Sequence, residues 1–237
     1  MPRPTHKQRV IFFDELRGFT ILSMIAFHTC YDLAYLYGWN MPWFTMGAFQ
    51  EIWRCSISWT FLFIAGWMTS LSRNNLKRGA LYATVALVVF IATTVAAVDT
   101  PINFGIIFCM AASTLLYWAL EKPLSRINPK ALLTIALVIF LATRGIPKTT
   151  YDIQGLSWLG FPSPTFVSGD YYPLIPFFFM YLAGATAARW HKNAGDNYPE
   201  WMYQSHIAPL GAIGTKSLPI YLIHQPLVLL VLMVALG

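Results

Sequence analysis

The stretch DELRGFTILSMIAFHTCYD, residues 14–32, combines an apolar run with ionisable side chains at helical spacing. Read as one helix, with about 100° of rotation per residue, it places four ionisable side chains on one face. These are Asp14, Arg17, His28 and Asp32. Glu15 lies on another face, and the rest of the surface is apolar. In a membrane helix, such a stripe faces the bundle interior or a water-filled cavity and marks a functional site.

The composition of the whole chain supports a membrane location for this stretch. Hydrophobic residues make up 57% of the chain and charged residues only 11%, whereas soluble domains carry about 25% charged residues. The net charge of +6 does not indicate nucleic-acid binding, because the basic residues lie in short loops between apolar segments. The sequence therefore predicts an all-α integral membrane helix bundle, in which residues 1–237 form one domain.

Seven apolar segments approach the ~20 residues that a helix needs to cross a bilayer. They lie at residues 13–37, 53–72, 79–98, 102–120, 131–146, 171–189 and 217–236. We interpret the first as a retained span rather than a signal peptide, because it carries charges and lacks a clean cleavage site.

The loop charges predict the orientation of these seven spans. The loops assigned to the inner side hold Arg3, Lys7, Arg9, Arg73, Lys77, Arg78, Lys122, Arg126, Lys130, Arg189, Lys192 and Lys216. Those assigned to the outer side hold only Arg54, Arg144 and Lys148. Since positive charge collects on the cytoplasmic side, the N-terminus is expected inside and the C-terminus outside.

His28 and Asp32 are the candidate catalytic residues. His28 lies eleven residues after Arg17, which is ~16 Å along a helix axis and near the middle of the membrane. Asp32, one turn later, could accept the N–H of one ring nitrogen and leave the other to take a proton, as in an oriented general base. The alternative is a buried pair that ties two helices together.

Arg17 and Asp14 are the candidate cofactor-binding residues at the inner end of this helix. An arginine there suits bidentate contacts to a phosphate-rich cofactor that arrives from the cytoplasm. The alternative is an intrahelical ion pair at spacing i, i+3 that orients the first span. Gly18, next to the arginine, would permit close packing of a neighbouring helix.

Four further polar residues are secondary candidates for substrate contact: His224, Gln225, Asn103 and Asp170. The first two precede Pro226 inside the last apolar segment, and Asn103 opens the fourth. Asp170 is expected first of all to cap the helix that follows it. The loop over 147–170 is long and rich in aromatic residues, as functional loops often are. No cluster has the spacing of metal ligands, so we expect no metal.

Several sequence blocks carry a family resemblance. Asp14-x-x-Arg17-Gly18 followed by His28 resembles the opening of membrane acyltransferases. Further blocks are FHTCYDL (27–33), FLFIAGWMTSLS (61–72), INFGII (102–107), DYYPLIPFFFMYLAG (170–184) and SLPIYLIHQPL (217–227). Together they resemble the bacterial relatives of heparan-alpha-glucosaminide N-acetyltransferase, in the family's order and over nearly the whole chain.

The resemblance implies a function. The family transfers an acetyl group from cytoplasmic acetyl-CoA, across the bilayer, to a sugar on the far side. We therefore expect a multi-pass acyltransferase of the bacterial inner (plasma) membrane, with acetyl-CoA or another acyl-CoA as co-substrate and an envelope glycan or glycolipid as acceptor. A second copy of the chain is a further candidate partner. His28 would either take the acceptor's proton or itself carry the acyl group.

Two departures from the family limit this inference. Relatives often carry a histidine after the FGI stretch, where Phe108 stands in this chain. The human enzyme has more spans and a luminal domain that this sequence does not show, so its glucosaminide substrate is not carried over. The alternative function is a proton-coupled transporter or lipid-handling protein without covalent catalysis, which the ionisable stripe would also suit. A third possibility is a structural subunit of an envelope complex.

Overall fold

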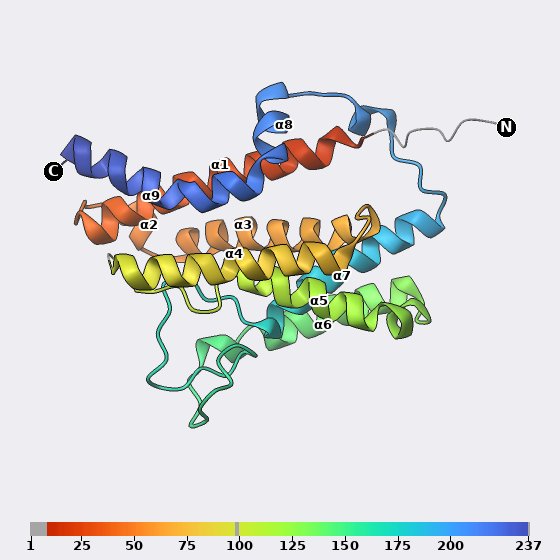
Figure 1. Cartoon of the computed structure of the whole chain (residues 1–237), viewed down its shortest axis with the longest axis horizontal. Helices are drawn as coiled ribbons and strands as arrows, with labels where there is room; N and C mark the ends of the chain where they lie inside the picture. The colour runs from red at the N-terminus through yellow and green to blue at the C-terminus, as the bar shows by residue number, and fades with distance from the viewer. Residues whose placement is uncertain (1–8, 98–99, 237) are drawn as a thin grey trace. The chain divides into compact units, whose positions relative to one another are not determined.

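The computed structural model describes residues 9–97 and 100–236 (Figure 1). Helices account for 73% of the structure, and no strand occurs among the described residues, which confirms the all-α class. The long helices are α1 (Ile11–Tyr31), α3 (Ala48–Trp67), α4 (Asn75–Ala96), α5 (Ile106–Ser125), α6 (Pro129–Thr143), α7 (Leu174–Asn193) and α9 (Ser217–Leu236). Each overlaps one of the seven apolar segments expected from the sequence.

Shorter helical turns join these long helices. They are the π-helix η1 (Asp32–Leu36), α2 (Pro42–Thr45), η2 (Met68–Ser70), η3 (Ile146–Lys148), η4 (Glu200–Tyr203) and α8 (Ala208–Thr215). The sequence predicts a loop in the α8 region, because no apolar segment of bilayer length covers it. Its eight residues include two glycines, which weaken any helical pattern.

Four helical stretches are long and apolar enough to cross a membrane: Ile11–Leu36, Asn75–Ala96, Pro129–Lys148 and Ser217–Leu236. The chain is therefore a membrane protein. The other three expected spans correspond to α3, α5 and α7, whose polar residues lower their mean hydropathy. The count of seven spans therefore stays a prediction. The side on which the N-terminus lies also stays a prediction. Arg3 and Lys7, which were counted toward it, lie outside the described residues.

The contacts of the chain divide it into two compact units. The terminal unit comprises Met1–Phe61 with Asn197–Gly237, and the central unit comprises Leu62–Asp196, so the boundary falls within α3. Each unit is described by itself below. The expectation of a single domain over residues 1–237 stays a prediction.

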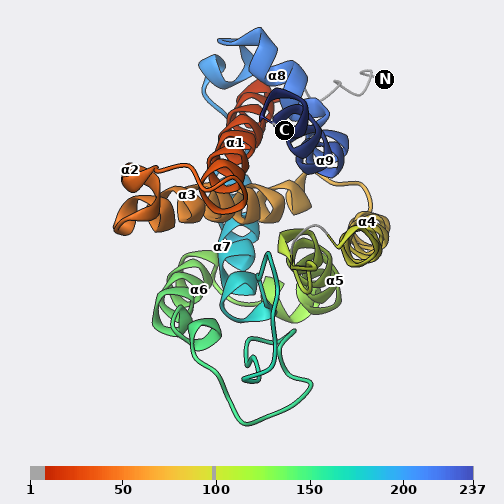
Figure 2. The same cartoon turned by 90° about the vertical axis from the view of Figure 1, so that its left-hand side faces the viewer.

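In the terminal unit, α1 lies beside α8 and α9 (Figure 2). Two glycines bring the backbones of α1 and α8 into direct contact. A Cβ atom on Gly18 would collide with the backbone oxygen of Leu210, and one on Gly214 with the backbone oxygen of Asp14. The close packing expected at Gly18 is thus confirmed, and small residues at such a crossing are typical of membrane helices.

The central unit is built around α7, which packs against α6 and α5. The final turns of α3 cross α7 at another pair of glycines, because a Cβ on Gly66 or Gly184 would collide with the facing backbone. A buried hydroxyl group adds polar contacts to this packing. The Tyr181 hydroxyl accepts a hydrogen bond from Arg78 at 2.8 Å and lies 2.9 Å from the Thr114 hydroxyl.

A residue just before α7 and a residue in its last turns contact the two ends of α5. The Asp170 carboxylate accepts the Ile106 N–H at 3.0 Å, at the start of α5. The Arg189 guanidinium donates to the carbonyls of Leu124 and Ile127, at 2.6 and 2.8 Å, at the end of α5. Negative charge at a helix N-terminus and positive charge at its C-terminus both complement the helix dipole.

The position of Asp170 corrects one expectation. We predicted that it caps its own helix, but α7 begins at Leu174 with Pro173 as its N-cap residue. The backbone of Pro173 is extended, with ψ 170°. Asp170 therefore lies before the first turn of α7, and its carboxylate caps α5 instead.

Replacing Gly214 by alanine is expected to lower the free energy of unfolding by roughly 1–3 kcal/mol, because overpacking forces two backbones apart. Thermal unfolding of the purified protein in detergent measures this change. Gly211→Ala on the same helix is the matched control, since its Cβ would lie 3.7 Å from Glu15 Cγ, an ordinary contact. Equal melting temperatures for the two variants would contradict the close crossing.

Candidate functional site

Asp14 is the centre of a charged cluster at the start of α1. Its carboxylate accepts hydrogen bonds from Arg17 Nη2 at 2.6 Å and from Arg9 Nε at 2.5 Å. The Asp14 residue is only 3% exposed, whereas the Arg9 side chain is 64% exposed. The intrahelical pair of Asp14 and Arg17 is therefore formed. Two guanidinium groups around one carboxylate leave this cluster with an excess positive charge.

Glu15 has a structural role that sequence analysis missed. Its Oε1 accepts the backbone N–H groups of His206 and Ile207, both at 2.8 Å, and the Ser205 hydroxyl at 3.0 Å. These groups directly precede α8, so Glu15 caps that helix from α1. The sequence signal was Pro209, because proline favours the first turn of a helix.

His28 and His224 form an imidazole pair between α1 and α9. Their ring centroids are 5.0 Å apart, and the ring planes are tilted by 57°. His224 is only 7% exposed, and its Nδ1 lies 2.6 Å from the Tyr221 carbonyl oxygen, one turn earlier in α9. A primary and a secondary candidate from opposite ends of the sequence therefore lie side by side.

A side-chain amide of α9 donates to Asp32. The Gln225 amide lies 3.1 Å from Oδ1 and 2.9 Å from Oδ2 of its carboxylate, and the expected N–H from His28 to this carboxylate stays a prediction. Asp32 is 1% exposed and opens the π-helix that continues α1. Single π-helical turns are frequent at functional sites.

Two polar atoms of this region are buried without a hydrogen-bond partner among the described residues: Nε2 of His224 and Oε1 of Gln225. Both atoms belong to α9. The His224 ring lies against His28, and the Gln225 amide donates to Asp32, one turn further along the chain. Four of the predicted site residues are thus brought together, and we call His28, Asp32, His224 and Gln225 the α1–α9 cluster.

Asn103 and Asp170 lie in the central unit, whereas the α1–α9 cluster lies in the terminal unit. The Asn103 side chain donates to the Val167 carbonyl at 3.2 Å, and its backbone N–H to the Ser168 hydroxyl at 2.9 Å. These bonds fasten the long loop to the start of α5. The structure therefore gives Asn103 and Asp170 structural contacts, and a substrate role for them stays a prediction.

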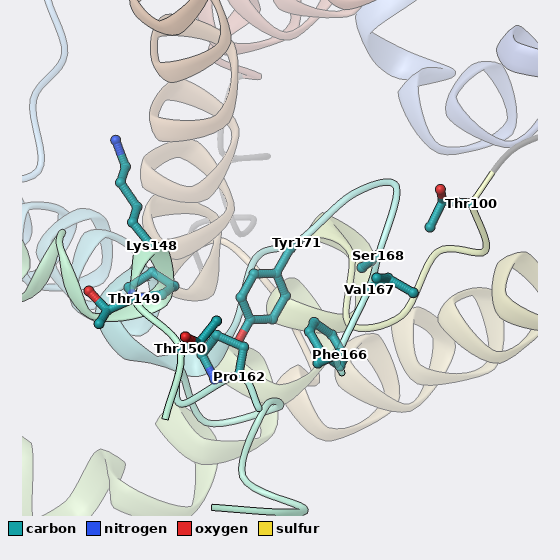
Figure 3. Close-up of a pocket in the computed structure, with 10 residues that line it drawn as sticks. Thr100, Lys148, Thr149, Thr150, Pro162, Phe166, Val167, Ser168 and Tyr171 are labelled. Carbon is teal, nitrogen blue, oxygen red and sulfur yellow. The ribbon is translucent and has the colours of Figure 1, made fainter. Parts of the chain in front are cut away.

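The long loop also lines an open pocket of about 390 Å³ in the central unit (Figure 3). Its lining includes Phe166, Ser168 and Tyr171. The Phe166 and Tyr171 rings are 4.9 Å apart, and the Tyr171 hydroxyl donates to the Ser157 carbonyl at 2.6 Å. Figure 3 shows the Lys148 side chain extending away from the Tyr171 ring. Rings and hydroxyl groups therefore dominate this lining.

The sequence pattern of the family described as "Heparan-alpha-glucosaminide N-acetyltransferase, catalytic" matches residues 9–226 of the chain. The chain belongs to this family. The matched range begins at Arg9 and ends at Pro226, so it includes the Asp14 cluster and the whole α1–α9 cluster. Nothing matches the chain in comparisons with curated proteins and with solved structures.

Membership of the heparan-alpha-glucosaminide N-acetyltransferase family, together with the apolar helices, indicates a membrane acetyltransferase. The family in general uses acetyl-CoA as its acetyl donor. Within residues 9–97 and 100–236, no group of three or more histidine, cysteine, aspartate or glutamate side chains is arranged to hold a metal ion.

The hydrogen bonds between Asp32 and Gln225 are expected to couple these two residues energetically. A thermodynamic cycle of Asp32→Ala, Gln225→Ala and the double variant should give a coupling energy of about 0.5–3 kcal/mol, because either single change strands a buried polar group. Chemical unfolding in mixed micelles provides the free energies. Glu200→Ala, which removes an exposed carboxylate of the same unit, is the control. Its cycle with Gln225→Ala should be additive, and additivity for Asp32 would refute the coupling.

Proposed function

We propose that this chain transfers the acetyl group of acetyl-CoA to a hydroxyl or amino group of an envelope glycan or glycolipid at the bacterial inner membrane. The observation that carries the proposal is the imidazole pair of His28 and His224, which the family's matched range includes. Both residues lie in helices apolar enough to span a membrane. Ionisable groups at such positions are costly to bury and mark sites of chemistry.

The donor would bind at the Asp14 cluster. Arg9 and Arg17 share one carboxylate between them, and the remaining positive charge suits the phosphates of CoA. The planar guanidinium fork binds phosphate oxygens in pairs. In this proposal, CoA approaches from the cytoplasmic side, because the basic loops are assigned to that side.

The reacting thioester would lie at His28. The eleven residues between Arg17 and His28 span ~16 Å of helix axis, and the pantetheine arm of CoA likewise separates its phosphates from its thioester. A CoA molecule lying along α1 would therefore bring its acyl carbon to the α1–α9 cluster. A sugar acceptor is supported by the family.

A transfer assay on the purified protein tests this function. Wild-type protein in lipid nanodiscs should release free CoA from acetyl-CoA and acetylate an added sugar such as glucosamine. His28→Ala should lower the rate of transfer while acetyl-CoA binding persists, because the reacting thioester would lie at His28. His206→Ala is the control, because His206 is an exposed histidine of the same unit. Acetyl-CoA binding without transfer by the wild type would instead favour a non-catalytic membrane protein.

Arg17→Ala is expected to raise the KM for acetyl-CoA by roughly 10- to 100-fold, because a hydrogen bond to a charged group contributes about 1.5–3 kcal/mol. The kcat should change less, since the lost contact binds ground state and transition state alike. Arg17→Lys should restore only part of the affinity, because lysine lacks the planar fork. Steady-state kinetics at varied acetyl-CoA concentration give both constants. An unchanged KM in a destabilised Arg17→Ala protein would leave the arginine only its structural pairing with Asp14.

A further inference from the structure

The contacts of His224 determine which of its ring nitrogens carries a proton. Its Nδ1 lies 2.6 Å from the Tyr221 carbonyl oxygen, and a carbonyl oxygen can only accept a hydrogen bond. Nδ1 is therefore protonated, and in the neutral ring Nε2 keeps its lone pair. Nε2 is buried without a partner among the described residues, in a residue that is 7% exposed. His224 thus presents an oriented basic nitrogen inside the terminal unit.

The contacts of Gln225 determine the direction of its amide in the same way. An ionised carboxylate can only accept, so the amide nitrogen must face Asp32, as its distances of 2.9 and 3.1 Å show. Oε1 then points away from the carboxylate. This oxygen is also buried, and no described residue donates to it.

The two unpaired atoms are both hydrogen-bond acceptors, on adjacent residues of α9. A buried acceptor without a donor is unfavourable, and buried polar groups in native proteins are nearly always paired. Any group that pairs with these two atoms must therefore be a donor, as water, hydroxyl and amino groups are. Hydroxyl and amino groups can donate, whereas an ionised phosphate, an ionised carboxylate and an ester carbonyl cannot.

We infer that the α1–α9 cluster binds the nucleophilic hydroxyl or amino group of the acceptor, that Nε2 of His224 takes its proton, and that Oε1 of Gln225 accepts a second hydrogen bond from the acceptor. This inference rests on the proposed function and assigns the base to His224 rather than to His28. The Tyr221 carbonyl orients the base, the role that sequence analysis had given to Asp32.

The transfer step balances with these groups alone. The acceptor oxygen or nitrogen bonds to the carbonyl carbon of the thioester while its proton passes to His224 Nε2. The bond between that carbon and sulfur breaks, and the electron pair leaves with the CoA sulfur. The proton on His224 then passes to the thiolate, which yields free CoA and the acetylated acceptor. His28, whose ring lies against His224, is left to contact the acyl group.

Kinetics on purified variants separate the two assigned roles, with acetyl-CoA as donor and glucosamine as the acceptor probe. His224→Ala should lower kcat by roughly 10²- to 10⁴-fold, the contribution of a general base, and added free imidazole should restore part of the rate. Gln225→Ala should raise the KM for glucosamine more than it lowers kcat. Acetyl-CoA binding should be unchanged in both variants.

His206→Ala is the matched control for these variants. His206 belongs to the same unit, and its ring also contacts a backbone carbonyl, with Nε2 2.9 Å from the Trp201 oxygen. Its loss should leave transfer at the wild-type rate. Transfer by His224→Ala within twofold of wild type would overturn the assignment of the base. A kcat loss that imidazole cannot rescue, accompanied by loss of acetyl-CoA binding, would also overturn it and indicate a structural histidine.

A spectroscopic measurement tests the site without relying on turnover. Nitrogen-15 NMR of histidine-labelled protein in bilayers, assigned with His224→Gln, should show a protonated Nδ1 and a bare Nε2. Adding glucosamine should shift the Nε2 resonance and leave that of His206 in place. A protonated Nε2 in the neutral ring would overturn the proposed acceptor site. A wild-type protein that neither transfers nor hydrolyses acetyl-CoA would overturn the proposed function. The tautomer of His224 would still decide whether this acceptor site exists.

Discussion

A buried carboxylate in an apolar segment must be paired, and the site depends on how Asp32 meets this requirement. The Gln225 amide donates to both of its oxygens, which ties the end of α1 to the middle of α9. Because His224 precedes Gln225 in the chain, the same contact holds the His224 ring beside His28. It also fixes the direction in which the amide oxygen points. One pairing of side chains therefore sets the register of the two helices.

Much of the fold could be predicted from the sequence, because apolar runs of bilayer length indicate helices directly. Each of the seven expected segments overlaps a long helix, although only four helical stretches meet the length and apolarity of a membrane span. The i, i+3 spacing of Asp14 and Arg17 predicted their pairing, since neighbours on one helix are set by local geometry. Gly18 likewise indicated a close helix crossing before its partner was known.

Partners on other helices could not be predicted, because they depend on which helices approach each other. Asp32 accepts hydrogen bonds from Gln225, Asp170 caps α5 rather than α7, and Glu15 caps α8 from α1. In each case the residue type indicated a need for a hydrogen bond, while the fold chose the partner. The roles of His28 and Asp32 in catalysis stay predictions, as does the role of Arg17 toward CoA.

The double capping of α5 has a consequence for local motion within the central unit. Helix ends ordinarily fray more easily than helix centres, because their last hydrogen bonds are the least protected. In α5 the first N–H is held by Asp170, which lies just before α7, and the Leu124 carbonyl by Arg189, which lies in the last turns of α7. Fraying at either end of α5 must therefore break a contact with the α7 segment. The ends of α5 are therefore expected to exchange their amide protons more slowly than uncapped helix ends.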